Sequence, residues 1–233
     1  MKILSIDSSG LVASVALMLD DILVGEYTIH NKKTHSQTLL PMISDMLAMA
    51  GTEPEELDCI AVSAGPGSFT GLRIGASTAK GLAWTLGIPV VPVSSLMGLA
   101  ANITEPERLV CAIMDARRSQ VYYGIYRITG GIPEIIVEPD VDAIEKVVDR
   151  VNEIGEKIIY LGDGVPVFED IIKERSRGEV CFEVPRNRYQ SGASVAALGR
   201  LLYEKGQYVQ AGEFAPVYLR KSQAEREREE KNS

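Results

Sequence analysis

The chain has 233 residues, a formal net charge of −8 and a hydrophobic fraction of 45 %. This hydrophobic fraction is enough for a sizeable core and argues against a disordered chain. The negative charge argues against a protein that binds nucleic acid alone, because such proteins usually carry a basic face. We therefore expect any contact with RNA to come through a partner.

The cysteines and the start of the chain indicate a reduced, cytoplasmic protein. Cys59, Cys111 and Cys181 are far apart, odd in number and close to apolar runs, which is typical of free core thiols. The opening MKILSIDSS is too short for a signal peptide, and no run of about 18 apolar residues predicts a membrane span. His30 and His35 do not share a helix face and lack a ligand cluster, so we expect no metal.

The first half of the chain begins with a predicted hairpin, whose turn is Asp20-Asp21. Gly51 and Gly87 end two of its predicted helices. The predicted strands are 2–6, 13–19, 22–29, 59–63 and 89–93, and the predicted helices are 36–50, 70–86 and 95–102.

The second half repeats this order more loosely. Its predicted strands are 109–114, 121–128, 134–137 and 157–161, and its predicted helices are 140–151, 166–174 and 193–204. Asp140 or Asp142 is the expected cap of the first of these helices.

The two similar halves predict an α/β fold of two stacked subdomains with a cleft between them. Residues 1–104 form the expected N-terminal subdomain. Residues 105–220 form the C-terminal one, whose last helix is free to pack back on the first. Residues 221–233 mix both charge signs and predict a solvated tail.

The segment GPGSFTG, residues 65–71, lies between a strand and a helix, where a phosphate-binding loop would lie. A Walker loop would end in Gly-Lys-Ser/Thr, but Leu72 and Arg73 follow Gly71, and the glycine spacing is one residue too long for a Rossmann fingerprint. The free amides of the helix start could still hold an anion.

Packing is the alternative role for these glycines. In that interpretation Thr70 caps the helix and Phe69 contacts Ile74. Gly71 and Gly75 lie one turn apart and would let another helix approach closely. Further small residues follow at Ala76, Ala79 and Ala83.

Helix 36–50 carries two neighbouring apolar stripes that together span about half of its circumference, more than one core face needs. The stripes consist of Leu39, Met42, Met46 and Met49, and of Leu40, Ile43, Leu47 and Ala50. One interpretation is a helix set deeply in its own core. The other is a helix that packs on its own sheet and also offers adaptable methionines to a partner.

Two turns place polar groups at the expected cleft. Asp7, Ser8 and Ser9 end the first strand, which suits either a phosphate and Mg²⁺ site or an ordinary Asx turn. DARRSQVYYG, which begins at Asp115, takes the matching place in the second half. We find no pattern typical of a catalytic nucleophile.

Together, the segments ILSIDSS, HSQTLLPMI, GPGSFTGLRIGASTAKGLA and MDARRSQVYYGIY resemble the TsaB (YeaZ) family, and the resemblance runs from Met1 to about Arg220. The family implies an actin-like (ASKHA) fold with two RNase-H-like subdomains and a mixed sheet in each. It also implies a non-catalytic partner of the TsaD subunit in tRNA threonylcarbamoyladenosine (t6A) synthesis.

The catalytic relative TsaD holds a metal with two histidines and a late aspartate. Here Ser95, Leu99 and Ala193 stand at those places, and Phe168 replaces an asparagine of its nucleotide motif. Serine is a poor metal ligand, and leucine and alanine are none. The resemblance therefore implies no cofactor and a vestigial nucleotide cleft at Asp7, Ser8, Ser9, Asp115, Gly162 and Gly164.

The resemblance also implies that helices 36–50 and 70–86 bind TsaD as a helical bundle. A second copy of this chain is expected to bind through the same helices or through a second surface. The expected contact residues are Leu39, Met42, Met46, Met49, Phe69, Gly71, Leu72, Gly75, Ala76, Ala79 and Ala83. The expected role is a scaffold for TsaD that helps recruit the TsaE ATPase and meets tRNA only within the complex. The alternatives are a stand-alone ASKHA-type phosphotransferase and an M22-like metallopeptidase.

Overall fold

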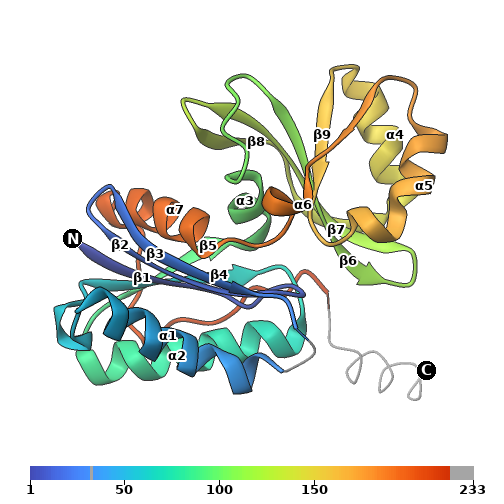
Figure 1. The fold of residues 1–233 in the computed structure, drawn as a ribbon. Coiled ribbons are helices and arrows are strands. Elements are labelled where there is room, and N and C mark those ends of the chain that lie inside the picture. The colour runs from blue at the N-terminus through green and yellow to red at the C-terminus, as the bar shows by residue number, and fades with distance from the viewer. Residues whose placement is uncertain (32–33, 221–233) are drawn as a thin grey trace, which may run out of the picture.

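The computed structural model describes residues 1–31 and 34–220. They form two five-stranded sheets, shown in Figure 1. The first sheet has the order β3-β2-β1-β4-β5, built from β1 (Lys2–Asp7), β2 (Ala13–Leu19), β3 (Ile22–Ile29), β4 (Cys59–Gly65) and β5 (Val90–Ser94). The second has the order β10-β9-β6-β7-β8, built from β6 (Leu109–Arg117), β7 (Gln120–Thr129), β8 (Ile132–Ala143), β9 (Ile158–Leu161) and β10 (Val180–Phe182).

The two sheets repeat one another strand for strand. In each, the first three strands in the chain pair antiparallel, and the next two add in parallel. The repeat predicted from the order of the elements is therefore present, although β10 and the short helix α6 (Pro185–Arg188) were not predicted.

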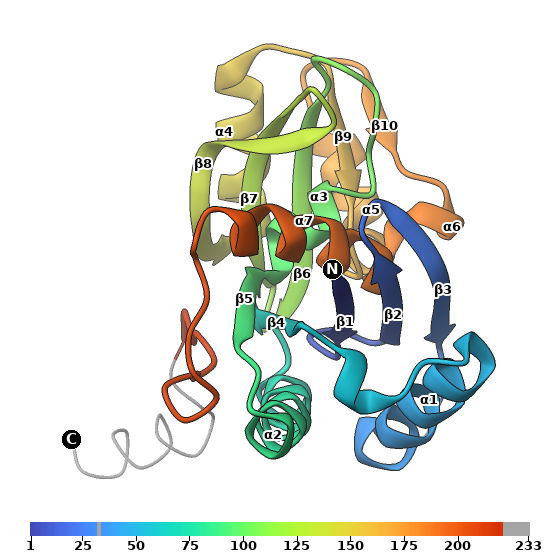
Figure 2. The same cartoon turned by 90° about the vertical axis from the view of Figure 1, so that its left-hand side faces the viewer.

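Two helices cover one face of each sheet. They are α1 (His35–Ala50) and α2 (Phe69–Leu86) on the first sheet, and α4 (Ile144–Ile154) and α5 (Val165–Arg175) on the second. Figure 2 shows α1 and α2 side by side below the first sheet. A short 3-10 turn, Pro54–Glu56, leads from α1 to β4. No helix among the described residues is both long and apolar enough to cross a bilayer.

The other faces are covered by an exchange of helices between the subdomains (Figure 1). Helix α7 (Gly192–Glu204), from the end of the chain, packs Val195, Ala196 and Leu198 on the first sheet. Helix α3 (Ser95–Ala100), which follows the first sheet, packs Leu96 and Leu99 on the second. Because each subdomain is completed by a helix of the other, the two halves are joined through their cores.

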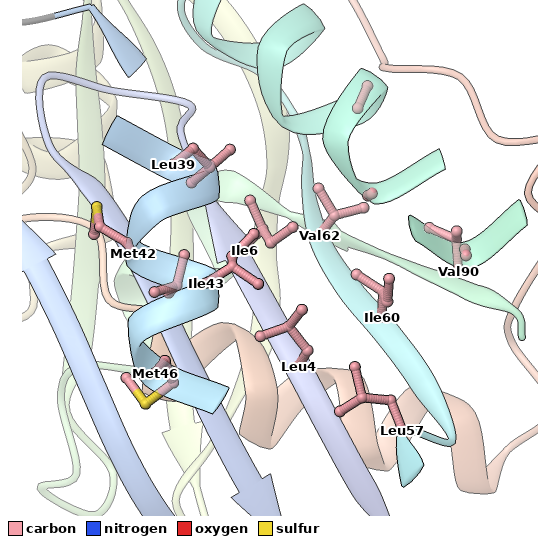
Figure 3. Close-up of a cluster of buried hydrophobic side chains, with 14 of the residues drawn as sticks. Leu4, Ile6, Leu39, Met42, Ile43, Met46, Leu57, Ile60, Val62 and Val90 are labelled. Carbon is pink, nitrogen blue, oxygen red and sulfur yellow. The ribbon is translucent and has the colours of Figure 1, made fainter. Parts of the chain in front are cut away.

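The largest core cluster lies between the first sheet and its outer helices (Figure 3). Alternate residues of β1 and β4 point to this side, among them Leu4, Ile6, Ile60 and Val62. Helix α1 covers them with a face that draws on both predicted stripes: Leu39, Met42, Ile43, Met46 and Leu47. Leu40 and Met49, one from each stripe, are left exposed.

Two predicted helix starts were wrong. Ser68, not Thr70, caps α2, because its hydroxyl accepts a hydrogen bond from the Gly71 amide. Strand β8 continues to Ala143, pairing with β7 through the residues predicted to cap a helix, so α4 begins only at Ile144. The predicted charged tail, 221–233, lies outside the described residues.

Candidate functional site: the outer helix face and the cleft

The structure buries nine of the eleven residues predicted to bind a partner. They are Leu39, Met42 and Met46 on α1, and Gly71, Leu72, Gly75, Ala76, Ala79 and Ala83 on α2. These side chains cover the chain's own sheet, which agrees with the interpretation of helices set in their own core, and the binding of a partner by this helix pair stays a prediction. Only Met49 and Phe69 of the predicted set reach the surface.

The small residues of α2 serve a close contact with the turn after β1. A Cβ added at Gly71 would lie 2.1 Å from the Ser8 carbonyl oxygen, and one added at Gly75 would lie 2.4 Å from the Ser8 Oγ. The approach is therefore close, as predicted, but the neighbour is a strand end and not another helix.

A groove of about 530 Å³ runs between α1 and α2 on the outer side of the molecule. Leu39 and Leu40 line it from α1, and Phe69, Arg73 and Ile74 line it from α2. Leu40 is 54 % exposed, and the Arg73 guanidinium lies 3.9 Å from the centre of the Phe69 ring. The groove offers an apolar floor with one cation beside it.

Exposed apolar residues continue along both helices beyond the groove. Met49 is 81 % exposed near the end of α1, and Trp84 is 73 % exposed near the end of α2. Trp84 is the only tryptophan of the chain and was not predicted as a surface residue. Its position in the helix, out of phase with the buried Ala79 and Ala83, could have indicated exposure.

The last described segment lies beside the start of α2. The Tyr218 ring packs 4.8 Å from the Phe69 ring, and the Tyr218 hydroxyl accepts a hydrogen bond from Arg73 Nε at 3.4 Å. Phe69 therefore contacts Tyr218 and Arg73, and it lines the groove together with Ile74, its predicted neighbour. The Val217 amide donates to the Ala64 carbonyl at 2.7 Å, so this segment extends the surface around the groove.

Two backbone amides of the glycine loop between β4 and α2 donate hydrogen bonds within the first subdomain. The Ser68 amide donates to the Ser9 carbonyl at 2.7 Å, and the Gly71 amide donates to the Ser68 hydroxyl. A Cβ at Gly67 would lie 2.3 Å from the Ser9 carbonyl oxygen. These contacts favour packing over phosphate binding as the reason for the glycines.

Asp7 is buried behind this loop rather than open to the cleft. Its Oδ1 accepts hydrogen bonds from the Ser9 amide and hydroxyl, and its Oδ2 accepts one from the Ser63 hydroxyl at 2.6 Å. Burial raises the pKa of the Asp7 carboxyl, and these hydrogen bonds oppose the rise. The Ser8 hydroxyl donates to the Gly71 carbonyl at 2.9 Å. Asp7 and Ser8 therefore hold the turn and do not line the cleft, contrary to the prediction.

The cleft between the subdomains contains a cavity of about 380 Å³. Ser9 lines it from the first subdomain, and Asp115, Arg117 and Asp163 line it from the second. Burial, with the nearby Asp115 carboxylate as a smaller cause, raises the pKa of Asp163 to about 6. Arg117 Nη1 lies 3.3 Å from Asp115 Oδ2. A triphosphate would meet two carboxyl groups and one arginine here, which is unfavourable.

The glycines predicted for nucleotide binding pack against strand β6. A Cβ at Gly162, whose φ is +107°, would lie 2.0 Å from the Ile113 carbonyl oxygen, and one at Gly164 would lie 3.2 Å from the same atom. Both glycines flank the cavity residue Asp163. Their close approach to Ile113 explains them without a ligand.

The positions of the relative's metal ligands are occupied by side chains of the core or the helix surface. Ser95 and Leu99 are fully buried in α3, and Ala193 is half-buried in the first turn of α7. His35 is engaged elsewhere, with its Nε2 3.0 Å from the Gly10 carbonyl oxygen. The described residues contain no group of three or more His, Cys, Asp or Glu that could hold a metal ion.

Comparisons with known proteins agree with the repeated fold. The family model for TsaD: tRNA N6-adenosine threonylcarbamoyltransferase matches residues 23–228. The Bacillus subtilis (strain 168) tRNA threonylcarbamoyladenosine biosynthesis protein TsaB is 37 % identical over 75 % of this chain and 76 % of its own length. The Escherichia coli (strain K12) protein of the same name is 30 % identical over 96 % of each chain. The chain belongs to the TsaB (YeaZ) family.

A solved structure of the same kind supports the fold. It is the crystal structure of an uncharacterized protein with similarity to peptidase YEAZ from Pseudomonas aeruginosa. It matches with a TM-score of 0.82 and 30 % identity, and the match covers 94 % of this chain and 99 % of that chain. With the repeated sheet order, this likeness confirms the predicted actin-like (ASKHA) fold of two RNase-H-like halves.

Proposed function

We propose that this chain is a non-catalytic subunit of t6A synthesis, which binds the catalytic TsaD subunit through the outer face of α1 and α2. The groove between these helices, with Leu40 exposed at its edge, carries this proposal. Aromatic and arginine side chains are enriched in protein–protein interfaces, so an apolar groove that carries both is typical of a binding surface. In this role the chain keeps TsaD in a competent shape, helps recruit the TsaE ATPase and meets tRNA only within the complex.

The absence of catalysis by this chain is part of the same proposal. Ser95, Leu99 and Ala193 stand where the resemblance places the metal ligands of TsaD. Serine is a poor metal ligand, and leucine and alanine cannot bind a metal. Asp7 is tied to Ser9 and Ser63 and is closed off from the cleft. These features support a subunit that contributes a binding surface to the complex and no catalytic side chain.

Without TsaD, the same face would pair with a second copy of this chain. An exposed apolar groove is unfavourable in water. Two copies related by a two-fold axis would bury the groove of each against the other, and such a dimer is closed and does not grow into a filament. We expect light scattering to show a concentration-dependent dimer for the purified chain. A strictly monomeric chain at high concentration would contradict this part of the proposal.

The test of the proposed function is a matched pair of arginine substitutions at exposed apolar positions. Leu40→Arg places a charge in the groove, whereas Ile136→Arg places the same charge on β8 of the second subdomain, where Ile136 is 46 % exposed and does not line the groove. We expect Leu40→Arg to weaken TsaD binding about 100-fold, equivalent to about 2.7 kcal/mol, and to lower t6A formation. Ile136→Arg keeps both close to those of the unchanged chain.

Circular dichroism decides whether either variant is misfolded, and calorimetry with purified TsaD measures the affinity. The proposed interface is wrong if Leu40→Arg folds and binds TsaD as tightly as the unchanged chain.

The interdomain cavity keeps one rival function open to test, a stand-alone phosphotransferase. It lies between the halves of an actin-like fold and contains Asp115 and Asp163, which could take part in phosphoryl transfer if they held Mg²⁺. ATP turnover by the purified chain that Asp163→Asn abolishes would favour this rival. No turnover without TsaD and TsaE favours the scaffold.

A further inference from the structure

A second cavity, of about 520 Å³, lies where the end of β3, the end of α3 and the segment before α7 meet. It shares no lining residue with the cavity in the cleft. Its size falls within the usual range for small-molecule sites. Nothing in the proposed scaffold role uses it.

Gln190, which lines this cavity, is the most unusual polar group in the described part of the chain. Its side chain is 2 % exposed, and neither Nε2 nor Oε1 has a hydrogen-bond partner among the described residues. A buried amide without partners is strongly unfavourable, so such a group needs an explanation. The amide lies against Gly10, where a Cβ would come within 2.2 Å of Nε2. It therefore loses no hydrogen bond when it turns toward a ligand in the cavity.

The wall that carries Gln190 is held in place by Asn102. Asn102 Nδ2 donates to the carbonyl oxygens of Asn187 at 2.8 Å and Tyr189 at 2.7 Å. Its Oδ1 accepts from the Ser194 hydroxyl at 2.7 Å. Because one side chain joins α3, the segment before α7 and α7 itself, the cavity is formed before any ligand arrives.

The rim of the cavity carries both charge signs, since Glu26 and Arg186 both line it. The first amides of α7 are already satisfied, since Glu26 Oε1 accepts from Ala193 N at 3.1 Å and Ser14 Oγ accepts from Gly192 N at 2.8 Å. The Glu26 carboxylate also accepts from the Ser191 hydroxyl at 2.8 Å and places a negative charge on the rim. With the first amides of α7 already used and one charge of each sign on the rim, a ligand without net charge that carries N–H donors is the simplest fit.

An aromatic pair forms part of the wall next to Gln190. The Tyr189 ring lies 5.4 Å from the His30 ring, centre to centre, and both residues line the cavity. Tyrosine and histidine side chains are surfaces on which planar bases stack. A glutamine amide pairs in two places with the N6 and N7 edge of adenine.

We propose that this cavity binds an adenine nucleoside, with the base beside Tyr189 and its N6–N7 edge paired with the Gln190 amide. The pairing would satisfy both orphaned atoms of Gln190. This proposal does not depend on the proposed scaffold function.

The test uses the purified full chain with adenosine as the probe. Inosine, which lacks the N6 amine, is the comparison ligand. Gln190→Leu removes the buried amide and keeps most of its volume, and Gln37→Leu removes an exposed glutamine on α1 as the matched control. Without ligand, we expect Gln190→Leu to raise the thermal midpoint by about 2–4 °C, because an unpaired buried amide is lost.

With adenosine in excess, the unchanged chain and Gln37→Leu should gain about 2 °C or more, while Gln190→Leu gains nothing. Calorimetry should show inosine binding at least tenfold more weakly than adenosine. The proposal is overturned if adenosine shifts no variant, or shifts Gln190→Leu as much as the unchanged chain. It is also overturned if Gln190→Leu lowers the midpoint and adenosine has no effect, because Gln190 then pairs with a structural water only.

Discussion

Gly75 lies directly over Ser8: a Cβ at position 75 would stand 2.4 Å from the Ser8 Oγ. The same hydroxyl donates a hydrogen bond to the carbonyl oxygen of Gly71, one turn earlier in α2. Helix α2 therefore rests on the turn after β1 at a distance that only glycine permits. The glycines at the start of α2 therefore hold the first subdomain together, while Leu40, Met49 and Trp84 on α1 and α2 stay exposed.

This contact predicts opposite effects for two Gly→Ala substitutions in one helix. Gly75→Ala should lower the free energy of unfolding by about 1–3 kcal/mol, because Ser8 and α2 must move apart. Gly81→Ala should raise it by about 0.5–1 kcal/mol, since an added Cβ there meets nothing within 4 Å and alanine favours the helix. Urea denaturation measures both. A Gly75→Ala variant as stable as the unchanged chain would show that Ser8 yields without cost.

The periodicity of α1 predicted a helix with a wide apolar surface, but it could not say which part faced the sheet. Leu39, Met42 and Met46 share one stripe with Met49, and the structure buries the first three and exposes the fourth. The angle at which a helix crosses its sheet decides where the buried face ends. That angle depends on residues distant in sequence, such as Gly25 on β3, which lies next to the Met46 sulfur.

Two methionines of α1 separate core from surface. Met46 is 2 % exposed and Met49 is 81 % exposed, three residues further along. Met46→Arg should lower the free energy of unfolding by several kcal/mol, because it buries an unpaired charge. Met49→Arg should change it by no more than about 0.5 kcal/mol. Thermal melts followed by circular dichroism measure both, and equal stability of the two variants would contradict the orientation of α1.

The cysteines offer a chemical check on burial. Burial raises the pKa of the Cys59 thiol to about 12, and it raises that of the Cys111 thiol as well. Cys181 is half-buried at the edge strand β10. An aromatic disulfide reagent should therefore label Cys181 quickly in the folded chain and the other two only in denaturant. Rapid labelling of Cys111 in the folded chain would show that the second sheet opens readily.

The exchange of α3 and α7 shows where local sequence patterns stop being informative. Both helices have apolar faces. The order of elements placed α3 in the first half, whereas it left the last helix, α7, free to pack back on the first subdomain, as it does. Their packing on the opposite sheets is set by Leu99 against the second core and Val195 against the first. The orphaned amide of Gln190 was not predictable either, because its environment arises only when Gly10 and the segment before α7 meet.

Asp163 should make the stability of the chain depend on pH in an unusual direction. The pKa of this carboxyl is raised from 3.8 to about 6 by burial, with a smaller contribution from Asp115, while Arg117 and two backbone hydrogen bonds oppose the rise. A carboxyl with a raised pKa stabilises the fold below its unfolded pKa, and this contribution is lost as the pH rises through about 6. Asp163→Asn stays neutral throughout, so its stability relative to the unchanged chain should increase by up to about 3 kcal/mol between pH 4 and pH 7. Asp170→Asn, on the exposed side of α5, is the control for the loss of one surface carboxylate. Urea denaturation at several pH values gives the difference directly, and a difference that stays constant from pH 4 to pH 7 would show that the Asp163 carboxyl ionises normally in the cleft.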